Sequence, residues 1–258
     1  MINTYTSYQL VARDLNKAIE RVEQQPTVER ATAYYLENIT KVTSIEEFMA
    51  DDKLFRYAMK AHGLEDMTYA KAFIRKALEG GIDDEASFAN QLTDSRYRDF
   101  VETFNFTTYG DTATVFTRAQ QGTVDRYLRQ TLEEDQGSQN EGVRLALYFE
   151  RKAPELESFY GILADTALGQ VVRTALGLPD SFASADIEKQ VAFFEQRFQI
   201  EDFQDPEKLG NFLKRFTALW DTTNTTSSEA ASISTLFSDT ASYGISTNLM
   251  LTIQSMKR

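Results

Sequence analysis

Apolar side chains recur every three or four residues along most of the chain, which is the spacing of amphipathic α-helices. Near the N-terminus the periodic positions are Tyr8, Val11, Leu15, Ala18, Ile19 and Val22. They predict a helix over Tyr5–Gln24, and the pattern resumes near Val28 beyond the helix-breaking Pro26. Strand-like alternation does not dominate any segment, so the pattern predicts an all-α fold.

Polar residues mark where the next helices begin and end. Ser44 and Glu47 have the spacing of a capping box, and Asp51 or Asp52 opens a helix that Gly63 ends. The pattern continues through predicted helices near Thr68–Glu79, Asp84–Leu92, Ser95–Phe104 and Ala185–Phe198, and through a helix that starts at Asp205-Pro206.

Two stretches read as connections. Glu133–Gly142, "EEDQGSQNEG", is polar, acidic and glycine-containing, and is the best loop candidate in the middle of the chain. Asp221–Ser232 is rich in Thr and Ser and has little apolar surface to bury, so we expect a linker there. The apolar positions of Gly244–Lys257 predict a short amphipathic helix beyond this linker.

One stretch occurs twice. "MADDKLFRYAMKAHGLED" (Met49–Asp66) returns as "LADTALGQVVRTALGLPD" (Leu163–Asp180) 114 residues later, with its Asp, Ala and Gly positions in step. The flanking matches are Tyr35–Glu37 with Tyr148–Glu150, Ala72–Ile74 with Ala192–Phe194, and Phe88–Leu92 with Leu209–Leu213. Any two helices with an Asp start and a Gly stop look alike, but four matches in the same order favour a tandem duplication.

The expected fold is therefore all-α, with two related helical bundles from an internal duplication and amphipathic helices at both ends. We divide the chain into an N-terminal helix (1–27), a first helical repeat unit (28–142), a second unit (143–221), and a Thr/Ser linker with a C-terminal helix (222–258).

Composition narrows the possible partners. Among 258 residues, 39 are Asp or Glu and 27 are Lys or Arg, so the net charge is −12 and most of the surface repels nucleic acid. No apolar run approaches 18 residues, so direct membrane insertion is not expected. Because the chain begins without a signal-peptide pattern, we expect a cytoplasmic protein, with export by a route that needs no cleavable signal left open.

Few residues suggest catalysis. There is no cysteine, and His62 is the one histidine, so a thiolate nucleophile, a hydrolytic triad and a two-histidine metal site are not expected. Leu176 stands at the place of His62 in the second repeat, which favours a packing role for both. We therefore predict no catalytic, cofactor-binding or metal-ligating residues.

Carboxylates are the remaining candidates for chemistry. Three clusters, Asp51-Asp52, Asp83–Glu85 and Glu201-Asp202 with Asp205, have side chains that suit acid–base work or a hard cation. Adjacent carboxylates at helix starts are also what caps and the helix dipole favour. An enzyme would need Asp51 and Asp165 to face one cleft between the units, whereas the structural interpretation has each capping its own helix.

Several longer stretches resemble a known family. "AYYLENITKVTSIEEFMADDKLFRYAMKAHGLEDMTYAKAFIRKALEGG", "VRLALYFERKAP" and "FLKRFTALWD" are similar to the bacterial DUF1217 family, over roughly residues 28–221. Members are known mainly from alphaproteobacteria, and some are encoded within flagellar gene clusters. The family has no established catalytic residues, so the resemblance implies a helical, non-enzymatic protein tied to flagellar assembly or structure.

The function that we expect is a flagellum-associated structural or assembly protein that binds protein partners, with self-association as a further option. Its contact elements would be the terminal helices Tyr5–Gln24 and Gly244–Lys257, although the first could instead pack on its own bundle. The alternatives are a cytoplasmic chaperone or regulator of flagellar export and, from another class, a carboxylate-dependent hydrolase or lyase. The protein would act in the cytoplasm, or at the flagellum after signal-less export.

Overall fold

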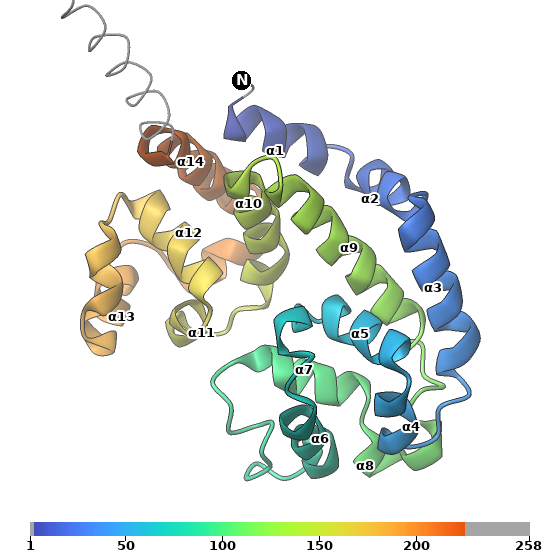
Figure 1. Cartoon of the computed structure of the whole chain (residues 1–258). Coiled ribbons are helices and arrows are strands. Elements are labelled where there is room, and N and C mark those ends of the chain that lie inside the picture. The colour runs from blue at the N-terminus through green and yellow to red at the C-terminus, as the bar shows by residue number, and fades with distance from the viewer. Residues whose placement is uncertain (1–2, 225–258) are drawn as a thin grey trace, which may run out of the picture.

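Helices make up all the regular structure of residues 3–224, which are the residues that the computed structural model describes (Figure 1). The α-helices are α1 (Thr4–Ala12), α2 (Leu15–Glu23), α3 (Pro26–Ile39), α4 (Ile45–Ala50), α5 (Asp52–Ala61), α6 (Lys71–Gly80), α7 (Ser95–Thr103), α8 (Phe106–Tyr109), α9 (Gln121–Gly137), α10 (Glu141–Lys152), α11 (Phe159–Ala164), α12 (Thr166–Leu176), α13 (Ile187–Glu195) and α14 (Pro206–Asn224). Within residues 3–224 the all-α prediction is confirmed, and no helix there is long and apolar enough to cross a membrane.

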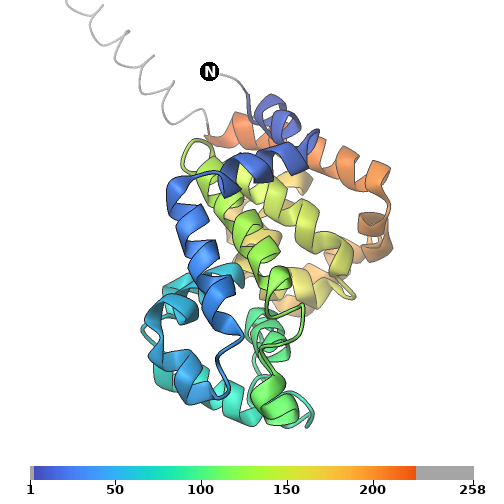
Figure 2. The same ribbon diagram turned by 90° about the vertical axis from the view of Figure 1, so that its right-hand side faces the viewer.

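Two separate apolar cores organise the helices. The first lobe, α2–α9, buries a group of aromatic rings that includes Phe48 and Phe104, whose centroids stack 4.7 Å apart. The second lobe, α1 with α10–α14, is built around Phe149 and Phe203, 5.1 Å apart edge to face. The two lobes lie side by side, and α9 extends between them (Figure 2).

The predicted loop Glu133–Gly142 is wrong, because most of it is helical. α9 continues through Gly137, and α10 begins at Glu141 after a turn that the Asn140 side chain caps. Glu133 has only 2% of its side chain exposed and pairs with Arg129 at 3.0 Å and Arg151 at 2.7 Å. Its charge, which suggested a solvated loop, instead joins α9 to α10.

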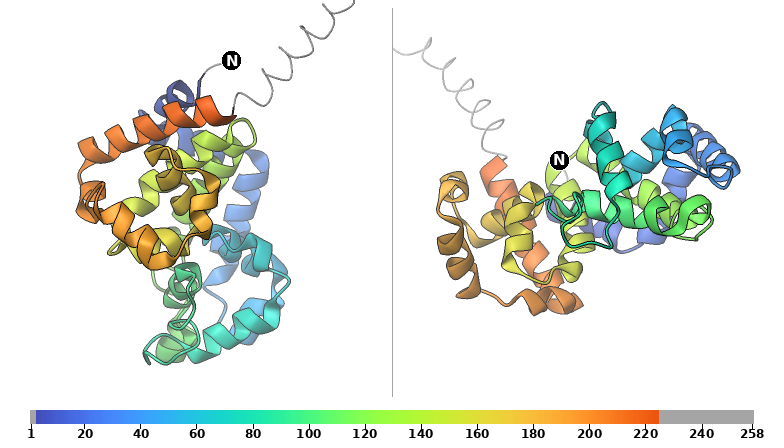
Figure 3. Two further views of the ribbon diagram at one scale, coloured as in Figure 1. Left: turned by 90° about the vertical axis from the view of Figure 1, so that its left-hand side faces the viewer. Right: turned by 90° about the horizontal axis from the view of Figure 1, so that it is seen from below.

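The N-terminal segment forms two helices instead of the predicted one. The chain breaks at Arg13-Asp14, and the Asp14 side chain caps α2. α1 then packs on α10 and α14, where Tyr8 is buried in the second core, while α2 packs on α9 (Figure 3). The N-terminal helices therefore pack within their own protein, the option that the sequence left open.

The predicted linker starts too early. Asp221 belongs to α14, and its carboxylate accepts hydrogen bonds from Thr4 N at 3.0 Å and Thr4 Oγ1 at 2.5 Å. These bonds cap the start of α1 with a side chain from α14, so Asp221 joins two helices instead of opening a linker. The predicted helix Gly244–Lys257 lies outside the described residues.

The predicted helix Asp84–Leu92 is also wrong, since these residues form consecutive turns. The Asn90 side-chain amide donates to the carbonyl oxygens of Ile82 at 2.8 Å and Asp84 at 2.9 Å. Side-chain bonds of this kind compete with helical backbone bonds. The segment is therefore a loop that follows α6.

A Tyr–Asp cap recurs at the 114-residue offset. Tyr34 Oη donates to Asp51 at 2.7 Å, and Tyr148 Oη donates to Asp165 at 2.5 Å. Each aspartate also accepts two backbone N–H groups at the start of the following helix, α5 or α12. Gly63 and the equivalent glycine after α12 then end these helices with φ of +68° and +70°.

This geometry corrects the register of the proposed repeat. Tyr34, not Tyr35, is the counterpart of Tyr148, while Tyr35 and Phe149 are both fully buried at the same offset. The last proposed match fails, because Phe88–Leu92 forms turns whereas Leu209–Leu213 lies in α14. The similarity is thus clearest over α3–α5 and α10–α12, and a duplication as its origin stays a prediction.

The α9–α10 ion pairs generate a stability prediction. Replacing Glu133 with Gln (Glu133→Gln) leaves two guanidinium groups facing each other without their shared carboxylate, and removing one partner of a buried pair costs about 3–5 kcal/mol. We expect a loss of that size in the unfolding free energy measured by urea titration. Glu134→Gln is the control: that side chain is 35% exposed and pairs with Lys60, so its loss should stay under about 1 kcal/mol. Equal losses would contradict the prediction.

Candidate functional site

His62 lies in the core of the first lobe, as its packing interpretation requires. Its ring is 8% exposed; Nδ1 donates to Ala58 O at 2.9 Å, and Nε2 lies 3.1 Å from Thr103 Oγ1. Burial, with a smaller contribution from the charge of Arg126, lowers the pKa of His62 to about 3. The imidazole is neutral at pH 7 and fixes the end of α5 against α7.

Asp51 and Asp165 cap their own helices. Burial raises the pKa of Asp51, but the hydrogen bonds from Tyr34 and from the backbone of Leu54 and Lys53 outweigh it and hold that pKa below its usual range. A general acid at neutral pH needs the opposite shift. Each of the two carboxylates therefore caps its own helix, which is the arrangement that the structural interpretation expected.

The other carboxylate clusters also have local partners. Asp83 accepts a hydrogen bond from Thr108 at 2.6 Å, Asp84 caps the turn at Ala86, and Asp202 pairs with Lys208 at 2.5 Å. Within residues 3–224 no three His, Cys, Asp or Glu side chains are grouped so that they could hold a metal ion.

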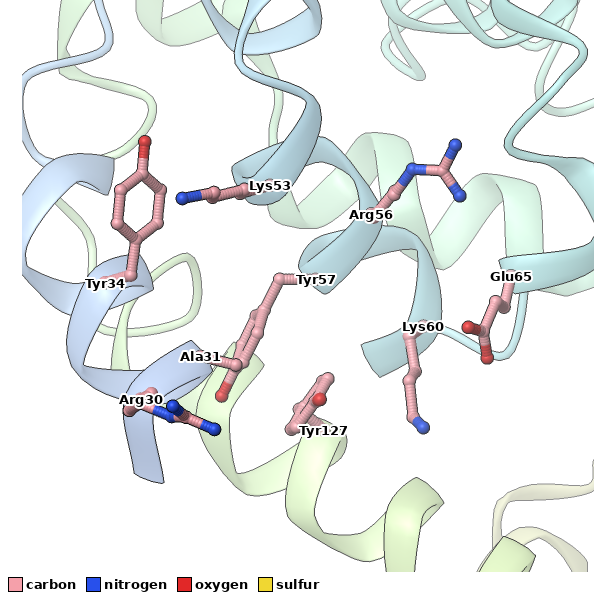
Figure 4. A pocket seen from close by; sticks show the side chains of 9 residues that line it. All are labelled: Arg30, Ala31, Tyr34, Lys53, Arg56, Tyr57, Lys60, Glu65 and Tyr127. Atoms are coloured by element: carbon pink, nitrogen blue, oxygen red, sulfur yellow. The ribbon is translucent and has the colours of Figure 1, made fainter. Parts of the chain in front are cut away.

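A pocket of about 410 Å³ opens between α3, α5 and α9 in the first lobe (Figure 4). We call it the basic aromatic pocket. Its lining residues are Arg30, Ala31 and Tyr34 from α3, Lys53, Arg56, Tyr57 and Lys60 from α5, Glu65 from the following turn, and Tyr127 from α9. Its size is in the range of small ligand sites.

Stacked tyrosines build the floor of this pocket. The Tyr57 ring stacks on Tyr127 at 3.8 Å and on Tyr35 at 4.4 Å. Tyr57 is 4% exposed, and its hydroxyl bonds with Thr32 Oγ1 at 2.9 Å. Because the ring is held on both faces and at its hydroxyl, the floor is rigid.

The rim is cationic on a protein whose net charge is −12. Arg56 pairs with Asp52 at 2.6 Å, and Lys60 pairs with Glu134 at 2.7 Å. In the part of the chain that the structure describes, Arg30 and Lys53 form no ion pair: Arg30 Nε donates to the Pro26 carbonyl, and Lys53 Nζ lies 4.7 Å from the centre of the Tyr34 ring. Two cations are therefore left for an anionic ligand.

A second, acidic depression of about 620 Å³ adjoins this pocket. Tyr34 and Lys53 line both, and the acidic depression adds Glu47, Asp51 and Asp52. The charge thus changes sign across Tyr34 and Lys53. A ligand at this surface meets a positive side and a negative side.

Sequence reasoning missed the basic aromatic pocket because its residues come from three helices far apart in the chain. One signal was available: Lys53, Arg56 and Lys60 follow the three-to-four-residue spacing of one helix face. The pairing of that face with Arg30 and Tyr127 depends on tertiary packing, which periodicity does not give.

The buried imidazole generates a pH prediction. His62 has a pKa near 6.5 in the unfolded chain and about 3 in the fold, so the unfolded state binds more protons between these values and stability falls as the pH falls. His62→Leu, which copies the residue of the second repeat, should flatten the dependence of the unfolding free energy on pH between 6.5 and 4, by up to about 1.4 kcal/mol per pH unit. Urea titrations at several pH values measure this slope. The same slope in both proteins would contradict the prediction.

Comparisons with known proteins agree with this fold. The X-ray structure of protein AGR_C_984 from Agrobacterium tumefaciens is similar with a TM-score of 0.81 and 50% sequence identity, over 87% of this chain and 97% of that one. No curated protein sequence matches. The family model described as a protein of unknown function, DUF1217, matches residues 61–209, more than half of the 258 residues, and the pocket residues on α3 and α5 precede that span. The chain belongs to the DUF1217 family.

Proposed function

We propose that this protein is a flagellum-associated structural or assembly protein that acts by binding protein partners and performs no catalysis. The flagellar part rests on the family, some of whose members are encoded in flagellar gene clusters. The binding part rests on the surface of the first lobe.

The basic aromatic pocket is the observation that most supports binding. Exposed Arg30 and Lys53 stand without ion-pair partners, within the described residues, above a floor of stacked tyrosines. Tyrosine and arginine are enriched where proteins contact each other, since they offer apolar area together with hydrogen bonds. The candidate catalytic carboxylates, by contrast, are occupied as helix caps or ion pairs.

The protein would act in the cytoplasm, or at the flagellum after export without a cleavable signal. A cytoplasmic chaperone or regulator of flagellar export is the alternative, favoured by the acidic, helical character of the chain. The identity of the captured partner separates the two: a basal or axial component favours the structural role, and an unexported subunit favours the chaperone.

The test combines two measurements: capture of protein partners from cells, and the motility of a strain that lacks the gene. The full-length chain, tagged and expressed at native level in motile cells, should recover a flagellar protein, and a strain that lacks the gene should swim more slowly on soft agar. Complementation with the wild-type gene is the control for polar effects. Normal swimming of the deletion strain, with no flagellar protein recovered, would overturn the proposal.

A further inference from the structure

We infer that the basic aromatic pocket binds a short acidic segment of a protein partner, with an aromatic side chain of that segment on the tyrosine floor. This inference rests on the proposed function and names the chemistry of the partner. It assigns the contact to α3, α5 and α9 and not to the terminal helices.

Charge selects an anionic partner. Arg30 and Lys53 are exposed on neighbouring helices and lie on the rim of one pocket. Arginine can donate two parallel hydrogen bonds to one carboxylate, and lysine adds a mobile point charge. Arg56 and Lys60 already pair with Asp52 and Glu134, and Glu65 adds one negative charge to the lining, so an acidic ligand would be bound chiefly by Arg30 and Lys53.

The tyrosine floor of the pocket favours an aromatic side chain of the partner. Tyr57 is covered on both faces by Tyr35 and Tyr127, so the pocket offers a partner the partly buried ring of Tyr127, beside the small side chain of Ala31. A third ring can stack or pack edge to face there, which contributes roughly 0.5–1.5 kcal/mol beyond the area that it buries. A cavity of about 410 Å³ holds one or two side chains, so the occupant is a short segment and not a whole helix.

Long polyanions and the protein's own tail fit this site poorly. The depression beyond Tyr34 contributes Glu47, Asp51 and Asp52, which repel an anionic strand that continues in that direction. Residues 225–258 contain two acidic residues, Glu229 and Asp239, against two basic ones, so this segment has no net charge to match the pocket. A segment with a few carboxylates beside one ring matches it better.

The experiment uses the full chain and a defined probe, the peptide acetyl-Glu-Asp-Phe-Glu-Asp-amide, titrated by isothermal calorimetry or by NMR shifts. The test variant is Arg30→Glu with Lys53→Glu, and the matched control is Arg98→Glu with Lys189→Glu, which makes the same change in net charge at exposed positions outside the pocket. We expect the control to bind as the wild type does, and the test variant to bind at least about tenfold more weakly, the equivalent of one lost ion pair at about 1.4 kcal/mol.

Two further peptides test the recognition itself. Replacing the four acids by their amides should weaken binding by at least about tenfold, and replacing Phe by Ala by at least about threefold. Circular dichroism checks that each variant is folded. Should the double Glu variant unfold, Arg30→Gln with Lys53→Gln removes the two charges without reversing them and gives the same comparison.

Equal affinity of the test and control variants for the acidic peptide would overturn the inference. A second result would also overturn it: the wild type binds AMP through Arg30 and Lys53 but does not bind the peptide. The pocket would then be a small-molecule site. If the pocket variant and the wild type capture the same amount of a flagellar protein from cells, this inference fails while the proposed function stands. If the peptide binds in the pocket but the deletion strain swims normally and no flagellar protein is recovered, the proposed function fails instead.

Discussion

The buried carboxylate of Glu133 is the constraint on which the arrangement of the two lobes depends. α9 contributes Leu128 and Leu132 to the first core, while α10 contributes Leu147 and Phe149 to the second, so the α9–α10 hairpin joins two apolar bodies. Apolar contacts are tolerant of small slides, but a carboxylate between Arg129 and Arg151 is not, because charges removed from water must keep their partners. α9 also supplies Tyr127 to the pocket floor, where its ring stacks on Tyr57 of α5.

The Tyr–Asp cap explains why one sequence pattern occurs twice without any shared chemistry. An aspartate at a helix start needs N–H donors, and a tyrosine hydroxyl from an earlier helix gives a second anchor across the fold. Each such bond therefore ties three elements: α3, α4 and α5 in the first lobe, and α10, α11 and α12 in the second. The surroundings of the caps are free to differ, and they do: Lys53 and Tyr34 border the basic aromatic pocket in the first lobe, whereas the equivalents of Lys53 and Arg56 in the second lobe are the uncharged Ala167 and Gln170. The capping arrangement recurs, and the cations that line the pocket do not.

Periodicity and caps predicted the helices well where one residue decided the boundary. Asp51, Gly63, Asp165 and Pro206 all act as expected, because capping and left-handed φ are local properties. The failures have long-range causes. Glu133 reads as a loop residue because its partner Arg151 lies 18 positions away on the next helix, and Asp221 reads as a linker residue because Thr4 lies 217 positions away. The pocket was missed for the same reason, as no local window contains Arg30, Lys53 and Tyr127 together.

For recognition, the sign of the charge at the contact surface matters more than the sign of the net charge of the protein. A chain with a net charge of −12 repels an acidic partner at long range, yet screening limits that repulsion to roughly a Debye length of about 8 Å at physiological salt. Inside that distance the partner meets Arg30 and Lys53, whose attraction is not offset by ion pairs within the described residues. Association would therefore be slow and selective, because the net negative charge disfavours contact over most of the surface and the cations of the basic aromatic pocket favour it locally. Under the inferred recognition, an acidic protein with a small basic site would discriminate against long polyanions and would keep affinity for a short acidic segment.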